Sequence, residues 1–328
     1  MHYLVGDIHG NYQGLLEVLG ACAFHKEKDV LYAVGDYFDG PYDLPDTLRV
    51  YEYLRDLGNS FQGILGNHDL GFLDYIYNNF NMFWSSFQES YAWLQQGGSH
   101  TLQAFGKRSQ EVAAWLRTLP LYQKIDISSI TQGRYENLLL LHGGLPVYRA
   151  NVSSKRCLAI LERYPYLEKD SKTTFRELGA KNARLWKSSL RETQWDRSLF
   201  STLFLYYIKK NKNLIKEDLE YQDVSRALRY SVQAREPDSS LMKRIASWIG
   251  PNLLGTGHTT TQVGTGYLSS SDTYQPFSLD IPSSGTPGKF LNLDTGGGWG
   301  GKISLYCIEN NTYYQSALAS SYYPDFAG

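Results

Sequence analysis

Five short apolar runs, each followed by glycine, histidine or acidic residues, organise the sequence. They are YLVGDIHG (3–10), VLYAVGDYFDG (30–40), FQGILGNHD (61–69), NLLLLHGG (137–144) and NLLGTGH (252–258). Short runs that are nearly continuous in Val, Leu and Ile are typical of buried strands, and the glycines after them allow the backbone to turn sharply. We therefore expect five strands with polar residues at their carboxyl ends.

The segments between and after these runs indicate how the strands are connected. Residues 11–24 and 44–57 place apolar side chains at helical spacing, so the chain is predicted to begin as β-α-β-α-β. Residues 291–310 (LNLDTGGGWGGKISLYCIEN) contain a short apolar run, a glycine-rich turn and the alternating run ISLYCI, which predicts a β-hairpin. The Ser-, Thr- and Pro-rich residues 264–289 are predicted to form a long loop.

Two regions depart from this alternation. Residues at about 150–250 contain helical segments, among them 198–219 and 239–250, and we interpret the region as a helical insertion or cap. The aromatic residues of 72–93 are expected to pack a core or cap, or to line a substrate groove. With 328 residues, 42% of them hydrophobic, the chain 1–328 is predicted to be one catalytic domain that carries this insertion.

Composition narrows the possible partners and the cellular setting. The 32 basic and 33 acidic residues leave a net charge of -1, which indicates neither a nucleic-acid partner nor a membrane surface. Cys22, Cys157 and Cys307 form no C-x-x-C pair, so we expect a reducing compartment. We expect no signal peptide, and no apolar run approaches the roughly 20 residues of a membrane span. These features favour the cytoplasm; delivery into a host cell as a bacterial effector is the alternative, because of the unexplained insertion.

The predicted strand ends carry residues suited to metal binding and proton transfer. They are Asp7, His9, Asp36, Asn67, His68, His142 and His258. Ligands of open α/β sheets bind beyond the carboxyl ends of the strands, so these side chains are expected to lie close together. Mixed Asp, His and Asn ligation suits Mn, Fe, Zn or similar ions. The sequence therefore predicts a metal site at this edge.

The motifs GDIHG, GDYFD, GNHD, HGGL and GHT, in this order, resemble the signature blocks of the calcineurin-like metallophosphoesterases, specifically the phosphoprotein phosphatase family. Its bacterial members include small serine/threonine protein phosphatases and diadenosine tetraphosphate hydrolases. The resemblance implies an α/β fold, a sandwich of two mixed β-sheets flanked by helices. It also implies two divalent metal ions, with Mn as the first choice and Fe, Zn or Mg as alternatives.

The resemblance assigns a role to each strand-end residue. It implies that Asp7 and His9 bind the first ion, that Asp36 bridges, and that Asn67, His142 and His258 bind the second. It further implies that His68 is the general acid and that Asp39 orients it. Two cations about 3.5 to 4 Å apart would polarise the phosphoryl oxygens and generate a bridging hydroxide for in-line attack, without a covalent phosphoenzyme.

One position departs from the family pattern. The motif usually reads G-D-x-x-D-R-G, and its arginine grips substrate phosphate through a planar fork, but this chain has Gly40 there. The segment ARLWKSSLRE (183–192) resembles a block that supplies another phosphate-binding arginine. Lys187 or Arg191 is our candidate for substrate binding, with Arg184 as a third; ordinary solvated helix charges are the alternative.

We therefore predict a metal-dependent phosphomonoester hydrolase that acts on phosphorylated proteins, with phosphoserine, phosphothreonine and phosphotyrosine all open. The enzymatic alternative is a dinucleoside polyphosphate or nucleotide hydrolase, which would use the same metal site. The alternative of another class is a catalytically weak protein-binding module that keeps the fold.

Overall fold

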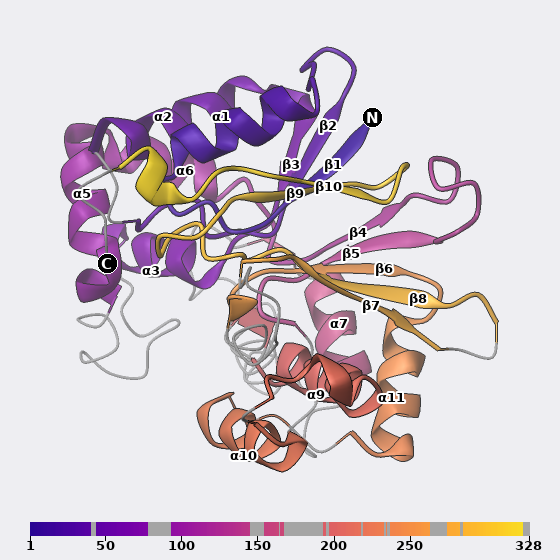
Figure 1. Ribbon diagram of the computed structural model, residues 1–328. Helices are drawn as coiled ribbons and strands as arrows, with labels where there is room; N and C mark the ends of the chain where they lie inside the picture. The colour runs from indigo at the N-terminus through magenta and orange to yellow at the C-terminus, as the bar shows by residue number, and fades with distance from the viewer. Residues whose placement is uncertain are drawn as a thin grey trace, which may run out of the picture.

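Two five-stranded sheets form the centre of the described part of the protein, seen in a computed structural model (Figure 1). The structure describes residues 1–40, 44–77, 93–144, 154–163, 165–166, 193–194, 197–217, 219–232, 234, 237–262, 274–282 and 285–323. The strand orders are β10-β9-β1-β2-β3 and β4-β5-β6-β8-β7, and each sheet contains both parallel and antiparallel pairs. Helices lie outside both sheets, so the expected sandwich of two mixed sheets flanked by helices is confirmed.

The first sheet begins with the β-α-β-α-β order expected from the apolar runs. Its parallel strands are β1 (His2–Val5), β2 (Val30–Ala33) and β3 (Phe61–Gly63), connected by α1 (Tyr12–Ala21) and α2 (Leu44–Asp56). Strand β9 (Ser304–Cys307) pairs antiparallel with β1, and β10 (Thr312–Gln315) pairs antiparallel with β9. The three parallel strands end on the same edge.

The second sheet contains the other two predicted strands. Strands β5 (Asn137–Leu140), β6 (Leu253–Thr256) and β8 (Gly288–Asn292) are parallel. Strand β4 (Gln123–Asp126) pairs antiparallel with β5, and β7 (Phe277–Ile281) pairs antiparallel with β8. The ends of β5 and β6 therefore face the same way as each other, as the strand-end hypothesis requires.

The core explains why the strands read as continuous apolar runs. Alternate residues such as Leu4 and Tyr32 pack against Leu140 and Leu253 of the second sheet. The residues between them, such as Val5, belong to the cluster that includes the helices. Strands buried on both faces have no polar alternation. The sheets approach closely at Gly255, where an added Cβ would lie 2.5 Å from Leu4 Cδ2.

The predicted hairpin at 291–310 is wrong. Strand β8 belongs to the second sheet and β9 to the first, so the glycine-rich turn passes between sheets, with an isolated bridge from Gly296 to Lys302. Strand β9 lies between β1 and β10 and is buried along its whole length, which leaves no edge for β8. The hairpin partner of β9 is β10.

The predicted loop at 264–289 is wrong at its carboxyl end. Residues Phe277–Ile281 form β7, and β8 begins at Gly288. The stretch FSLDI alternates, and its ends Phe277 and Ile281 are buried, which is the period-2 pattern of an edge strand. Residues 263–273 lie outside the described residues.

The helices form two groups, and residues 78–92 of the aromatic segment 72–93 lie outside the described residues. Below the second sheet in Figure 1 lie α7 (Ser154–Arg163), α9 (Ser198–Lys210), α10 (Tyr221–Val232) and α11 (Ser239–Ile249). Beside the first sheet lie α3 (Asn67–Ile76), a π-helical turn (Leu94–Gly98), α5 (Ser99–Phe105) and α6 (Ser109–Leu116). Short 3-10 turns span Gly58–Ser60, Gly106–Arg108, Lys212–Leu214 and Ala319–Ser321.

Helix α11 coincides with the segment 239–250 named as helical from the sequence, whereas α9 covers only the first part of 198–219 and ends at Lys210. Phe200 and Phe204 of α9 pack against Phe277 of β7, at ring distances of 5.4 and 5.7 Å, so this helix rests on the second sheet. The interpretation of about 150–250 as an insertion or cap of one 1–328 domain stays a prediction. No helix within the described ranges is both long and apolar enough to cross a membrane.

Candidate functional site

The strand ends of both sheets meet at one cluster of buried polar side chains. Asp36 follows β2, and His142 and His258 follow β5 and β6; ligand-type atoms of these three residues lie within 4.8 Å of one another. A second group, Asp7, His9 and Asp36, meets the same criterion. Asp36 belongs to both groups, which is the position that a bridging ligand would occupy.

Asp36 contacts residues of both sheets. Its Oδ2 lies 3.1 Å from His142 Nε2 and 3.8 Å from His9 Nε2. Its Oδ1 accepts the backbone N–H of His68 at 2.9 Å. The carboxylate is thus fixed by α3 on one side and leaves its other oxygen between two imidazoles.

Backbone carbonyls determine which nitrogen of two histidines faces the cluster. His142 Nδ1 lies 2.8 Å from Val34 O, and His9 Nδ1 lies 2.9 Å from Phe38 O. Because a carbonyl only accepts, Nδ1 must carry the proton, and in a neutral ring Nε2 then presents a lone pair. Both Nε2 atoms point at the acceptor oxygen of Asp36, an arrangement that a cation would make favourable.

Asn67 and Asp7 add further oxygen atoms with unmet bonding capacity. Asn67 Oδ1 lies 2.8 Å from both His142 Nε2 and His258 Nδ1. Asp7 Oδ2 accepts the backbone N–H of His258 at 2.9 Å, whereas its buried Oδ1 has no hydrogen-bond partner among the described residues. An unpaired buried carboxylate oxygen is costly, and a cation would satisfy it. This donor set of carboxylate, amide and imidazole atoms fits divalent ions such as Mn, Fe or Zn.

Buried carboxyl groups also crowd one another at this site. Burial, with the neighbouring carboxylates Asp294 and Asp36, raises the pKa of Asp7 well above its usual range. Burial, with the Asp36 carboxylate, raises the pKa of Asp294 to about 6, although the Gly296 N–H opposes this shift. Divalent cations would favour the ionised forms of such carboxyls.

His9 and His258 are held neutral, which suits metal ligation. Burial, followed by the neighbouring His68, lowers the pKa of His9 to about 4. Burial, followed by His142 and Arg197, lowers the pKa of His258 well below its usual value. A neutral imidazole is the form that binds a metal ion.

His68 and Asp39 form a separate pair beside the cluster. His68 Nδ1 lies 3.0 Å from Asp39 Oδ2, and Trp93 Nε1 donates to the same oxygen. Burial lowers the pKa of His68, but the carboxylates of Asp36 and Asp39 outweigh it and raise that pKa to about 9. Cations beside Asp36 would offset part of this charge. The pair therefore has the composition of a proton donor held by a carboxylate.

The loops that carry these side chains adopt a backbone that non-glycine residues rarely use. His9, Asp36, Asp39 and His258 have φ of 49°, 53°, 69° and 63°. Such strain clusters at functional sites and needs support from its surroundings. Asp69 supplies some of it, because its carboxylate accepts the N–H groups of Asp36, Tyr37 and Gly66. We did not predict Asp69 as a site residue, although it ends the GNHD motif.

The structure does not describe the residues that the sequence suggested for phosphate binding. Lys187, Arg191 and Arg184 lie outside the described residues. The structure instead places the exposed Arg197 at the cluster, with Nε 3.4 Å from His258 Nε2. Sequence reasoning missed this residue, which lies beyond the end of the 183–192 segment.

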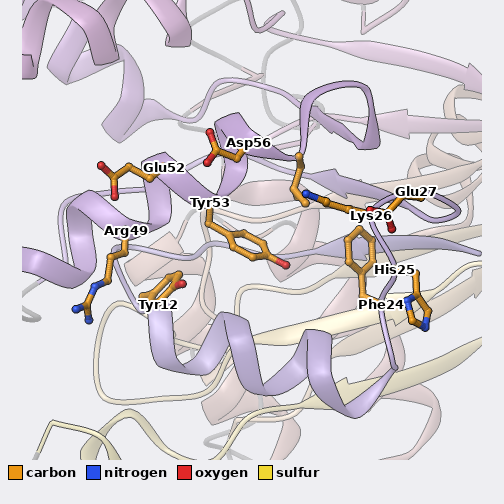
Figure 2. Close-up of a pocket in the computed structure, with 10 residues that line it drawn as sticks. Tyr12, Phe24, His25, Lys26, Glu27, Arg49, Glu52, Tyr53 and Asp56 are labelled. Atoms are coloured by element: carbon orange, nitrogen blue, oxygen red, sulfur yellow. The ribbon is translucent and has the colours of Figure 1, made fainter.

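A pocket elsewhere on the molecule shares no residue with this site. Figure 2 shows it between α1 and α2, with a volume of about 540 Å³. Its lining includes the aromatic rings of Tyr12, Phe24 and Tyr53 together with side chains of both charges. The mixture favours no particular ligand, so the candidate chemistry lies at the strand ends.

A family model described as calcineurin-like phosphoesterase matches residues 3–199. The chain therefore belongs to the calcineurin-like phosphoesterase family, and the resemblance found in the five motifs is confirmed at this level. Members of the family use divalent metal ions, which agrees with the Asp and His groups described above. The protein is accordingly a metallophosphoesterase.

Several curated relatives are named symmetrical bis(5'-nucleosyl)-tetraphosphatase. One from Pectobacterium carotovorum is 23% identical over 97% of this chain and 96% of its own length. Another from Aromatoleum aromaticum is 38% identical over 36% of this chain and 38% of its length, and one from Hamiltonella defensa is 42% identical over 22% and 25%. The matches of higher identity thus span well under half of those relatives.

Two solved structures match over most of this chain at low identity. One, assigned provisionally as a diadenosine tetraphosphatase, has a TM-score of 0.47 and 17% identity, over 97% of this chain and 92% of that one. The other is a serine/threonine phosphatase from Saccharomyces cerevisiae, with a TM-score of 0.41 and 13% identity, over 96% of this chain and 79% of that one.

Proposed function

We propose that this metallophosphoesterase hydrolyses phosphomonoesters and that its substrates are phosphorylated proteins. The observation that carries the proposal is the His68–Asp39 pair, 3.0 Å apart, beside the Asp36 cluster. An alkoxide or phenolate leaves poorly unless it receives a proton, whereas a phosphate leaving group is already a weak base. A histidine positioned by a carboxylate is therefore most useful for phosphoserine, phosphothreonine or phosphotyrosine.

The cluster supports a division of roles among its residues. Asp7 and His9 would hold one divalent ion, Asp36 would lie between two, and Asn67, His142 and His258 would hold the other, with Mn as the proposed metal. When bound, such ions supply positive charge for the phosphoryl oxygens and activate water. His68 would then give its proton to the leaving oxygen, and Asp39 would hold the ring.

Arg197 supports substrate binding at the same place. Gly40 provides no side chain, and the guanidinium of Arg197 is exposed next to His258. A guanidinium offers paired donors for phosphate. We propose that it contributes to the phosphate clamp, and Lys187 and Arg191 remain candidates alongside it.

Dinucleoside polyphosphates are the second candidate substrate class. The names of the relatives favour them, including the relative that aligns over 97% of the chain. Trp299 also favours them, because its side chain is 53% exposed and its ring lies 6.3 Å from that of His9. An exposed indole at a phosphate site can stack on a base.

One comparison decides between these candidates. The protein would be stripped of metal, reloaded with Mn, and assayed on para-nitrophenyl phosphate, a panel of phosphopeptides and diadenosine tetraphosphate. We expect the highest kcat/KM on a phosphopeptide, and Asp36→Asn should abolish all turnover. A higher kcat/KM on diadenosine tetraphosphate would replace our first candidate with the second. No turnover with any divalent metal would favour the protein-binding module.

The cellular setting is a further proposal. Cys22 and Cys307 are free thiols, which supports a cytoplasmic location; delivery into a host cell is the alternative.

A further inference from the structure

We propose that Trp93 is a positioning residue for proton transfer: its indole N–H holds the Asp39 carboxylate in the orientation that presents His68 to the leaving oxygen. The proposal rests on the role of His68 proposed above. It connects the aromatic segment, for which the sequence indicated only packing or a groove, with the chemistry of the site.

The first observation is a shared acceptor. Trp93 Nε1 donates to Asp39 Oδ2, the same oxygen that lies 3.0 Å from His68 Nδ1. Trp93 and Asp39 are 3% and 2% exposed, so water does not compete freely for that oxygen. Because both donors converge on one atom, the carboxylate cannot rotate about its terminal torsion without lengthening both bonds.

The second observation is that the indole itself is held rigidly. An added Cβ at Gly71 of α3, or at Gly98 of the π-helical turn, would lie 2.6 Å from a ring atom of Trp93. Two backbones thus contact the ring directly, an approach that only glycine permits. A residue so enclosed provides a fixed donor.

The third observation is that the same segment holds the backbone of Asp39. The N–H of Asp39 donates to Thr101 Oγ1 of α5 at 3.0 Å, and an added Cβ at Gly97 would lie 2.2 Å from Asp39 O. Asp39 has φ of 69°, a strained conformation that needs such support. Residues 93–101 therefore fix both the backbone and the side chain of Asp39.

A positioning role differs from ordinary packing in how it affects different substrates. Loss of packing would lower the fraction of active enzyme and reduce turnover of all substrates equally. Loss of positioning would affect substrates in proportion to their need for a proton, because general acid catalysis matters most for basic leaving groups. Phenyl phosphate and 2,4-dinitrophenyl phosphate differ strongly in this respect, because dinitrophenolate is a far weaker base than phenolate.

The test uses Trp93→Phe, which keeps a ring and removes the N–H. For the Mn-loaded enzyme we expect kcat on phenyl phosphate to fall about 10- to 100-fold, in line with the loss of a bond to a charged group. The fall on 2,4-dinitrophenyl phosphate should be no more than about 3-fold, with KM and metal content unchanged. Equal falls on both esters, or none, would overturn the proposal.

The matched control is Trp115→Phe. This second indole stacks on Phe61 at 6.0 Å and packs against Phe38, which precedes Asp39 in the chain, whereas the contacts described for the Asp39 carboxylate come from His68 and Trp93. Trp115→Phe should lower the stability of the protein and change kcat on both esters by the same factor. If Trp93→Phe does not fold, site-specific incorporation of 3-benzothienylalanine at position 93 removes the N–H while keeping the shape of indole.

The Asp39→Asn background separates this proposal from the proposed function. If Trp93 acts through Asp39, the second change should add no further difference between the two esters. If the losses on the two esters differ strongly in Asp39→Asn but not in Trp93→Phe, the role of Trp93 alone is overturned. No difference in Asp39→Asn would overturn the roles of His68 and Trp93 together, and no turnover by the parent enzyme would overturn the proposed function.

Discussion

Asp36 Oδ2 lies 3.1 Å from His142 Nε2, and this contact joins the end of β2 in the first sheet to the end of β5 in the second. The site is therefore shared by the two sheets, because the group of Asp36, His142 and His258 draws on both of them, although Asp7, His9 and Asp36 all follow strands of the first sheet. His142 is completely buried and its other nitrogen contacts Val34 O, again across the two sheets. Binding of metal should accordingly be coupled to the packing of the sheets.

That coupling predicts a stability effect of metal. Exhaustive chelation should abolish hydrolysis and lower the melting temperature, and Mn should restore both. A ligand present at 100 times its Kd stabilises the folded state by about 2.7 kcal/mol. Calorimetric scans of chelated and Mn-loaded protein, with parallel assays, measure the effect. Full activity after chelation would exclude the metal-dependent mechanism.

Substitution of the two carboxylates of GDYFDG, Asp36 and Asp39, should have different effects. Asp36→Asn should lose bound metal, because Asp36 belongs to both groups of ligands. Asp39→Asn should keep metal and lose turnover, since Asp39 contacts His68 and Trp93 instead. Elemental analysis after dialysis, combined with kcat, distinguishes the two. Equal loss of metal in both variants would contradict the assignment.

Arg197→Ala should weaken the binding of substrate phosphate and leave the metal content unchanged. A lost charge-assisted bond of roughly 1.5 to 3 kcal/mol corresponds to a fall in kcat/KM of about 10- to 150-fold. The control is Arg226→Ala on α10, because that side chain is 79% exposed and lies beside Asp223. Lys187→Ala, Arg191→Ala and Arg184→Ala belong to the same series. Kinetics of Arg197→Ala that equal those of Arg226→Ala would place the clamp elsewhere.

The sequence predicted the parts of this protein that depend on local pattern. Apolar runs followed by Asp, Asn or His identified β1, β2, β3, β5 and β6. Because ligands bind beyond the carboxyl ends of strands, the sequence also predicted that Asp36 and His142 lie close together. The pairing of β9 was missed because a glycine-rich turn between two apolar runs looks the same whether the runs share a sheet or not. Only the burial of β9 between β1 and β10 decides this.

Residues that support the site were harder to predict than those that form it. Trp93 lies 54 positions from Asp39 in the sequence, and Arg197 lies 61 positions from His258. Neither pair leaves a local signal, because the contact depends on how helices pack beside the sheets. Gly40 showed that a charge was missing, but not where its replacement lies.

Gly257 provides a test of the first metal position in which none of the proposed ligand residues is substituted. A Cβ added there would lie 1.8 Å from Asp7 Oδ1, so Gly257→Ala should displace that carboxylate and lower the bound metal from two ions to one. The matched variant is Gly255→Ala, two residues earlier, whose Cβ would meet the flexible end of Leu4 at 2.5 Å. Overpacking there should cost about 1 to 3 kcal/mol of stability and leave both ions bound. Two ions in Gly257→Ala would mean that Asp7 is not a ligand, whereas loss of metal in Gly255→Ala alone would mean that sheet packing, not the position of Asp7, controls the site.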